Sequence, residues 1–331
     1  MSAFLFSWEL LFKNILKLAE ISKLIDCRLI GDGFLEISSV ASCKNPKAES
    51  IVYVSRQKYL TKKIVKKSGA ILVGSDIDIV SYNGNFLVSN NHKLSFSKLT
   101  KLYKKSNDKN LTKSHYLISS SAKIGENLIF GNGVVIEENV EIGKNVSLGH
   151  NVVIMSNSKI GNNVTIDSGT IIGSEGFGNF RDAKNKWLHI DHIGAVHIKD
   201  NVSIGSNCTI DRGTIDNTVI SSGVIIDNLV HIAHNVFIGS DTAIAAKVGI
   251  AGSCIIGKRN LIGGMVGIID HITTTDDVTI SATSTITSDL REPGVYTGIM
   301  PTSKHAIWKR VAMWIRKLDK IAKLLNLEKV K

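Results

Sequence analysis

Large apolar residues recur at every sixth position from residue 118 onwards. The first series runs without a break through Ile118, Ile124, Phe130, Ile136, Ile142, Leu148, Ile154, Ile160, Ile166 and Ile172. The period resumes at Ile198, shifts by four residues after Ile210, and continues to Ile286 with Thr274 as its one polar member. A period of six fits neither a helix of 3.6 residues per turn nor a plain alternating strand.

This period predicts a left-handed parallel β-helix, in which three groups of six residues form one triangular coil of eighteen. The aliphatic residue of each group points inward and stacks on its equivalents in neighbouring coils. A Gly or Asn that follows it is expected at a corner, where the backbone dihedrals are difficult for other residues. The solenoid is assigned to residues 114–302, and its exposed ends need capping segments.

Two segments leave the period and are expected to loop out of the prism. They are residues 173–196 and the shorter insertion at 211–218. Long loops on a rigid scaffold often carry function. A tolerated surface insertion is the equally open alternative for both.

The flanking segments have a different pattern. Residues 1–113 predict a separate α/β domain, with helices at 15–25 and 57–67, strands at 50–54, 70–73 and 85–88, and a linker at 104–114. Residues 303–331 predict a C-terminal amphipathic helix with a coiled-coil-like seam and a basic outer face. Its apolar positions are Ile307, Val311, Trp314, Leu318, Ile321 and Leu325.

Charge is unevenly distributed along the 331 residues, whose net charge is +11. Residues 1–113 hold 19 basic against 9 acidic residues, 114–303 hold 12 against 18, and 304–331 hold 9 against 2. Basic ends suit an anionic partner, such as an acidic protein, phosphates or a membrane surface contacted peripherally. Solvated lysine-rich faces are the alternative. No nucleic-acid-binding motif accompanies the charge, so nucleic acid is not expected.

The composition indicates a cytoplasmic protein. No apolar run reaches the ~20 residues that span a bilayer, and the first dozen residues lack the basic region and cleavage site of a signal peptide. The four cysteines, Cys27, Cys43, Cys208 and Cys254, match neither a disulfide framework nor a zinc motif.

The strongest candidate for chemistry is His234, which lies off the inward column in a dense polar segment at 227–235. Eighteen residues on, Gly252 is expected one coil above it, with an accessible backbone N–H about 5 Å away. A general base beside a free N–H donor suits acyl transfer, because one accepts a proton and the other stabilises the oxyanion. No nucleophile motif is present, which favours direct transfer.

A zinc site is the alternative for these histidines. His231, His234 and His271 could supply three nitrogen ligands, as in β-helical carbonic anhydrases. Asp227 and Asn228 favour the first interpretation, since they suit groups that orient a histidine and contact a substrate. No metal is therefore expected.

Several motifs resemble the UDP-3-O-(3-hydroxyacyl)glucosamine N-acyltransferases of lipid A and lipopolysaccharide biosynthesis. They are Ile172–Gly178 (IGSEGFG), Thr209–Gly213 (TIDRG), Gly223–Asn235 (GVIIDNLVHIAHN), Ile262–Gly264 (IGG) and Glu292–Tyr296 (EPGVY). The resemblance covers nearly the whole chain, more loosely over 31–59. It implies a homotrimer with active sites between neighbouring β-helices. The reaction implied moves a 3-hydroxyacyl chain from acyl carrier protein to the 2-amino group of a UDP-3-O-acylglucosamine.

The resemblance also implies residue roles. His234 is the general base, Asp227 the carboxylate that orients and polarises it, and the N–H of Gly252 the oxyanion donor. Asn228 and His271 contact substrate, and His231 is placed with them. Tyr53 and Tyr59 hold the positions of two aromatics that sandwich the uracil ring, although Arg56 replaces a common amide.

No cofactor is expected, because the acyl group arrives on the phosphopantetheine arm of the carrier protein. The basic face of the C-terminal helix suits that acidic partner through Lys309, Arg310, Arg316, Lys317 and Lys320. Small polar residues at 281–287 are expected to set the acyl chain length. Two rivals remain: a sugar-nucleotide N-acetyltransferase that uses acetyl-CoA, and a scaffold solenoid without activity.

Overall fold

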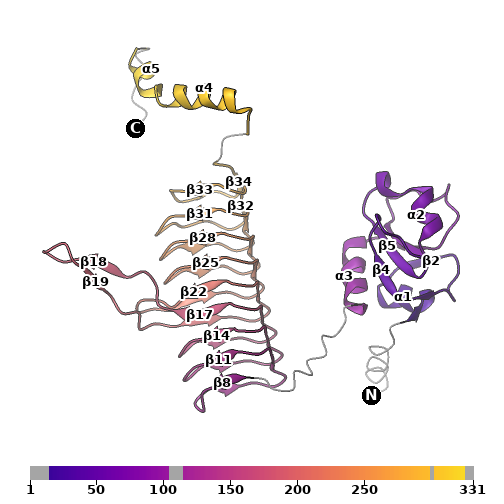
Figure 1. Cartoon of the computed structure of the whole chain (residues 1–331), viewed down its shortest axis with the longest axis horizontal. Helices are drawn as coiled ribbons and strands as arrows, with labels where there is room; N and C mark the ends of the chain where they lie inside the picture. The colour runs from indigo at the N-terminus through magenta and orange to yellow at the C-terminus, as the bar shows by residue number, and fades with distance from the viewer. Residues whose placement is uncertain (1–14, 104–114, 299–301, 325–331) are drawn as a thin grey trace. The chain divides into compact units, whose positions relative to one another are not determined.

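The computed structural model describes residues 15–103, 115–298 and 302–324 (Figure 1). The chain divides into two compact units, Met1–Asp108 and Lys109–Lys331. The boundary expected at residue 113 and the seam position Leu325 lie outside the described residues.

The first unit is built on a five-stranded sheet in the order β2-β7-β6-β5-β4. Its elements are β1 (Leu16–Lys17), α1 (Leu18–Leu24), β2 (Arg28–Ile30), β3 (Glu36–Ile37), β4 (Ser39–Ala41), β5 (Ser50–Val54), η3 (Gln57–Tyr59), α2 (Lys62–Lys67), β6 (Ala70–Gly74), β7 (Phe86–Ser89) and α3 (His92–Leu102). The three predicted strands correspond to β5, β6 and β7. The helix expected at 57–67 is divided into η3 and α2 at Leu60 and Thr61. The sequence analysis did not predict α3.

The second unit is a three-sided prism of parallel sheets. Sheet 1 contains β8 (Tyr116–Ile118), β11 (Val134–Ile136), β14 (Val153–Ile154), β17 (Ile171–Ser174), β22 (Thr209–Asp211), β25 (His231–Ile232), β28 (Gly249–Ile250), β31 (Gly267–Ile268) and β33 (Thr285–Ile286). Sheet 2 contains β9 (Lys123–Ile124), β12 (Glu141–Ile142), β15 (Lys159–Ile160), β20 (Val196–Ile198), β23 (Thr218–Ile220), β26 (Phe237–Ile238) and β29 (Ile255–Ile256). Sheet 3 contains β10 (Ile129–Phe130), β13 (Ser147–Leu148), β16 (Thr165–Ile166), β21 (Ser203–Ile204), β24 (Ile225–Ile226), β27 (Ala243–Ile244), β30 (Leu261–Ile262), β32 (Val278–Ile280) and β34 (Gly294–Tyr296).

The hexad positions form the core of this prism. Ile232 pairs with Ile210 below it and Ile250 above it, and all three are fully buried. Each buried aliphatic side chain contributes about 1.5–3 kcal/mol from the hydrophobic effect. The register of the coils therefore follows from the stacking of inward aliphatic side chains on one another. The polar member of the series, Thr274, is buried too.

The corners correct one expectation. The backbone enters the left-handed region three residues after the inward position, mostly at Asn, as at Asn145 (φ +57°) and Asn163 (φ +55°). The Gly directly after an inward residue has another role. A Cβ on Gly143 would lie 2.7 Å from the carbonyl of Gly161 in the next coil. This Gly is needed because coils approach closely, not because of its dihedrals.

The two predicted insertions leave the prism between consecutive strands, the first after β17 and the second after β22. Residues 173–196 include an antiparallel hairpin, β18 (Asn179–Arg181) and β19 (Trp187–His189), that stands out from the prism (Figure 1). The shorter insertion connects β22 to β23 and is tied to the loop by Gly194 N donating to Gly213 O at 2.9 Å. The two interruptions therefore meet beside sheet 1.

The C-terminal extension forms two helices rather than one. They are α4 (His305–Ile315) and α5 (Leu318–Leu324), with a turn at Arg316 and Lys317. Within the described parts of the chain, we find no helix with the length and hydrophobicity needed to cross a membrane.

Candidate active site

His234 lies at the corner that follows β25, and its neighbour Asn235 fixes its orientation. Nδ1 of His234 lies 3.1 Å from Oδ1 of Asn235. That oxygen also accepts from Thr214 N at 2.9 Å, while Nδ2 of Asn235 donates to the carbonyl of Asp216 at 3.0 Å. Because these two backbone groups fix which amide atom is oxygen, Nδ1 must be the donor. Nε2 is then the free, proton-accepting atom of a neutral ring.

Gly252 lies one coil above and faces the ring. A Cβ on Gly252 would lie 2.6 Å from both Cε1 and Nε2 of His234, so a side chain there would displace the imidazole. At several other corners the equivalent N–H is capped from the next coil, as when Ser206 N donates to Oδ1 of Asn228 at 2.7 Å. Among the described residues, the N–H of Gly252 has no such acceptor. A free donor therefore lies beside the free ring nitrogen.

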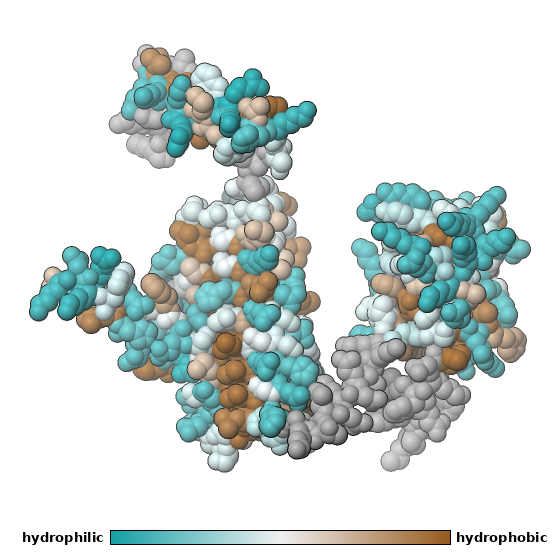
Figure 2. Space-filling model, in the orientation of Figure 1, coloured by the Kyte–Doolittle hydropathy of each residue, from teal (hydrophilic) through white to brown (hydrophobic). Residues whose placement is uncertain are grey.

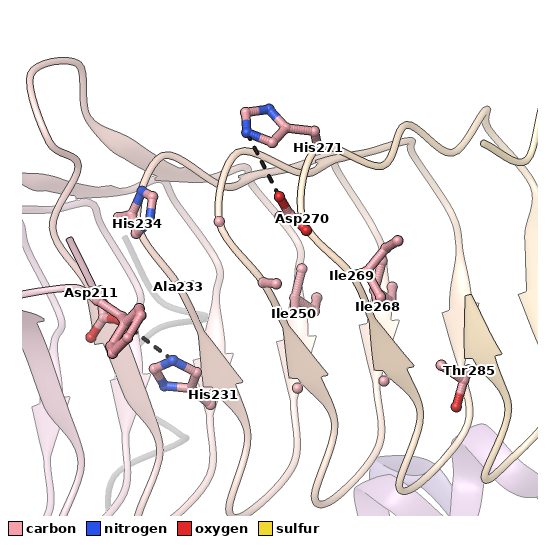
Figure 3. Close-up of a pocket in the computed structure, with 15 residues that line it drawn as sticks. Asp211, His231, Ala233, His234, Ile250, Ile268, Ile269, Asp270, His271 and Thr285 are labelled. Carbon is pink, nitrogen blue, oxygen red and sulfur yellow. Dashed lines mark ion pairs between the residues drawn. The ribbon is translucent and has the colours of Figure 1, made fainter. Parts of the chain in front are cut away.

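An apolar groove of about 670 Å³ extends from these groups along sheet 1 (Figure 3). Its floor is the outward ladder His231, Gly249, Gly267 and Thr285. A Cβ on Gly249 or Gly267 would meet no atom within 4 Å, so the two glycines leave the groove open. Its flanks include Ala233, Ala251, Ile268 and Ile269. The groove can hold an extended aliphatic chain.

The protruding loop brings a second histidine against the first. The ring of His192 packs edge-to-face on His234 with centroids 5.1 Å apart, and His192 is 3% exposed. Its Nδ1 donates to the carbonyl of Ile190 at 3.0 Å, and its buried Nε2 has no hydrogen-bond partner in the part of the chain that the structure describes. Gly176 and Gly178 make room for this ring. The sequence analysis did not single out His192, because it lies outside the hexad register.

Asp211 was also missed as a site residue, although it belongs to the TIDRG motif. It lines the groove, is 4% exposed, and lies on β22 directly below β25. Burial, the largest effect, raises its pKa, and the hydrogen bond from Ser174 and the nearby imidazoles of His231, His234 and His192 offset this only in part. The signal in the sequence was an Asp immediately after an inward Ile, where Gly is common.

The predicted residues divide into two groups around sheet 1. His231, His234, Gly252 and His271 line the groove. Asp227 and Asn228 lie at the opposite edge of the sheet, where β24 leads into β25. Oδ1 of Asp227 accepts from the backbone N and Nδ2 of Asn228, at 2.7 and 2.9 Å. Within one chain, Asn235 rather than Asp227 is hydrogen-bonded to His234, and the role predicted for Asp227 stays a prediction.

The predicted uridine contacts lie in the first unit. One face of Tyr53 stacks on Phe96 with centroids 4.2 Å apart, and its hydroxyl lies 2.6 Å from Nδ1 of His92. Tyr59 is 45% exposed, with the ammonium of Lys58 5.1 Å from its ring centroid. Tyr53 thus has one face engaged within the unit, and Tyr59 is the more available platform.

The predicted carrier-binding residues lie on the C-terminal helices. Lys309 and Arg310 belong to α4, Lys320 belongs to α5, and Arg316 and Lys317 form the turn between them. All five are exposed. The exposed apolar side chains of Trp308, Met313 and Trp314 accompany them.

The three histidines of the zinc alternative do not form a metal-ligand cluster among the described residues of one chain. Among the described residues, Glu175, His189 and Asp191 bring three possible metal-ligand atoms within 4.8 Å of one another, and all three residues are exposed. His231, His234 and His271 do not converge in this way.

Comparison with known proteins identifies the family. The model of the bacterial transferase hexapeptide (six repeats) matches residues 121–155. The UDP-3-O-acylglucosamine N-acyltransferase of Albidiferax ferrireducens is 36% identical over 310 residues, covering 92% of this chain and 94% of that one. This chain belongs to the UDP-3-O-acylglucosamine N-acyltransferase family. It is therefore an acyltransferase.

Shorter matches agree with this N-acyltransferase assignment. The namesake from Bordetella avium is 42% identical over 153 residues, which are 45% of this chain and 42% of that protein. The matched segment thus covers less than half of the length of some relatives.

Solved structures support the fold. The UDP-N-acetylglucosamine O-acyltransferase of Moraxella catarrhalis is 29% identical with a TM-score of 0.50, over 56% of this chain and 70% of that one. LpxA from Acinetobacter baumannii is 27% identical with a TM-score of 0.51 over the same shares. Together with the three parallel sheets, these matches confirm the predicted left-handed β-helix.

Proposed function

We propose that this protein transfers a 3-hydroxyacyl chain from acyl carrier protein to the 2-amino group of UDP-3-O-(3-hydroxyacyl)glucosamine, as a step of lipid A synthesis. The amine nitrogen attacks the thioester carbonyl, forming a C–N bond. The C–S bond then breaks, the carrier thiolate leaves, and the amine proton reaches that thiolate through His234. No external cofactor is needed for this balance.

The observation that carries the proposal is the pairing of His234 with Gly252 at the foot of the apolar groove. The free Nε2 can accept the amine proton, and the free N–H can stabilise the oxyanion. One such donor alone is worth about 2.7–4 kcal/mol of barrier. The volume and apolar flanks of the groove suit a long acyl chain better than an acetyl group.

We further propose a homotrimer in which each active site is shared by two chains. Asp227 and Asn228 lie on the edge of sheet 1 opposite His234, so they can serve a neighbour's groove but not their own. Exposed apolar residues on the prism, including Ile171, Ile225, Phe237, Ile255 and Leu261, provide surface for such contacts. Figure 2 shows apolar patches on the face of the prism that is in view. His271 is assigned to substrate binding, and Tyr53 and Tyr59 to the uridine.

Acyl carrier protein is the proposed docking partner of the C-terminal helices. Their basic residues suit an acidic surface, and contacts of this kind are weak and salt-sensitive. Neutralising Lys309, Arg310, Arg316, Lys317 and Lys320 together should raise the Michaelis constant for the carrier at low salt, with a smaller effect at high salt. An unchanged constant at low salt would remove this assignment.

The reaction is tested by mass spectrometry of the sugar nucleotide. Purified protein is incubated with UDP-3-O-acylglucosamine and 3-hydroxyacyl carrier protein, with acetyl-CoA as a parallel donor. Formation of the diacylated product, lost in His234→Ala, supports both reaction and base. Transfer from acetyl-CoA alone favours the acetyltransferase, and transfer from neither donor leaves the scaffold as the alternative.

A further inference from the structure

Asp211 lines the same groove as His234, and its carboxylate is buried. Oδ1 of Asp211 accepts from Oγ of Ser174 at 2.7 Å. Oδ2 lies 3.5 Å from Nε2 of His231, as Figure 3 shows. A buried carboxylate is costly unless it is paired or hydrogen-bonded. The position therefore requires a compensating group nearby.

That compensation does not come from the adjacent arginine. Nε of Arg212 donates to the carbonyl of Gly173 at 2.7 Å, and its Nη2 donates to the carbonyl of Ser156 at 3.1 Å. Across the described ranges, no lysine or arginine forms an ion pair with Asp211. The cationic groups available to it are the imidazoles of His231, His234 and His192.

Such an arrangement suits a charge that appears only during reaction. When His234 accepts the amine proton, its ring becomes an imidazolium inside a largely enclosed corner. A fixed negative charge nearby stabilises that cation more strongly than it would in water. The neutral ground state gains much less, so the effect lowers the barrier rather than improving binding.

We propose that Asp211 is the electrostatic partner of His234, a positioning residue that stabilises its imidazolium while Ser174 holds the carboxylate in its charged form. The inference rests on the proposed function. Within one chain, Asp211 then has the charge-stabilising role that the family resemblance implies for Asp227.

The test compares Asp211→Asn with the wild-type trimer across pH. The kcat should fall by roughly tenfold to a hundredfold, which corresponds to a loss of about one to two pKa units of imidazolium stabilisation. The KM should change little. The acid limb of the kcat profile should move to lower pH, because an imidazolium without its counter-charge loses its proton more readily. The other titratable groups around His234 are His192, His231, Glu175, His189, Asp270 and His271, and all are retained in this variant.

Asp167→Asn is the matched control, because it removes the same charge from an exposed side chain that also follows an inward Ile, away from the groove. It should leave the profile unchanged. A wild-type enzyme without acyl transfer would refute the proposed function. An active wild type with an unshifted Asp211→Asn profile would refute only this inference.

Ser174→Ala keeps the test decisive if Asp211→Asn does not fold. This variant keeps the carboxylate but removes the bond that favours its charged form, so Asp211 becomes neutral at a higher pH. Activity should then decline earlier as the pH is lowered and match the wild type at alkaline pH. A decline identical to that of the wild type would overturn the inference.

Discussion

Oδ1 of Asn235 and Nδ1 of His234 lie 3.1 Å apart, between residues adjacent in sequence at one corner of the prism. The backbone there is left-handed at Asn235 (φ +61°), which turns the amide back onto the preceding ring. The same residue thus forms the corner and determines the tautomer of the proposed base.

Removing the Asn235 side chain should therefore impair catalysis without straining the corner. Glycine tolerates the left-handed backbone, so Asn235→Gly removes the amide alone. We expect kcat to fall by roughly tenfold to a hundredfold, within the contribution of a positioned base. Asn201→Gly, at an equivalent exposed corner (φ +60°), is the control for lost solenoid stability. Equal activities of the two variants would contradict the tautomer argument.

Gly252→Ala tests the space that the base occupies. The added methyl group would lie 2.6 Å from Nε2 of His234 and would force the ring away. A displacement of about 1 Å can cost roughly a hundredfold in rate, so we expect at least that loss of kcat. Gly298→Ala adds a methyl group at an ordinary 3.6 Å contact and should remain active. A fully active Gly252→Ala enzyme would exclude this geometry.

The outward ladder of sheet 1 should determine which acyl chains fit. Of residues 281–287, expected from the sequence to set chain length, Thr285 lines the groove. Gly267→Val should shorten the groove more than Thr285→Val, because Gly267 lies one coil nearer to His231. Each methylene that loses its contact costs about 0.8 kcal/mol, roughly fourfold in kcat/KM. Competition between carrier-bound chains of different lengths measures this order, and equal preferences would refute it.

The fold was predictable because each coil contacts only its neighbours in the stack, so spacing along the sequence determines which residues meet. Within each uninterrupted block of the hexad series, an Ile stacks on the residue eighteen positions away, so the spacing alone specifies the sheets and the height of Gly252 above His234. The site was only partly predictable for the same reason. His192 reaches the base through a loop that leaves the register, and no spacing rule gives its position. Asp211 follows an inward Ile on β22, but the insertion after it puts the paired residues of β25 22 rather than 18 positions away. Asp227 lies on the edge of sheet 1 opposite His234, so the role that the resemblance implies for it depends on a neighbouring chain, which one sequence does not show.

A shared active site predicts complementation between inactive variants. If Asp227 serves a neighbour's His234, trimers that mix Asp227→Ala and His234→Ala chains contain some sites with both groups intact. Activity should reappear when the two variants are co-expressed, although each is inactive alone. The two variants mixed as preformed trimers that do not exchange chains provide the control. Co-expressed mixed trimers without activity would place Asp227 within its own chain's site, and an active Asp227→Ala enzyme would place it outside the reaction.

The single polar residue of the hexad series should resist replacement by an apolar one. Thr274 is 2% exposed, and its Oγ1 accepts from Nδ2 of the buried Asn260 at 2.6 Å and from Gly257 N at 3.1 Å. Thr274→Val restores the apolar pattern and keeps the volume, yet it leaves two buried donors unpaired. An unsatisfied buried group costs about 1–3 kcal/mol, so this variant should be destabilised. Thr274→Ser retains the acceptor, so its free energy of unfolding, measured by denaturant titration, should fall less. A Thr274→Val variant as stable as the wild type would show that Asn260 finds another partner.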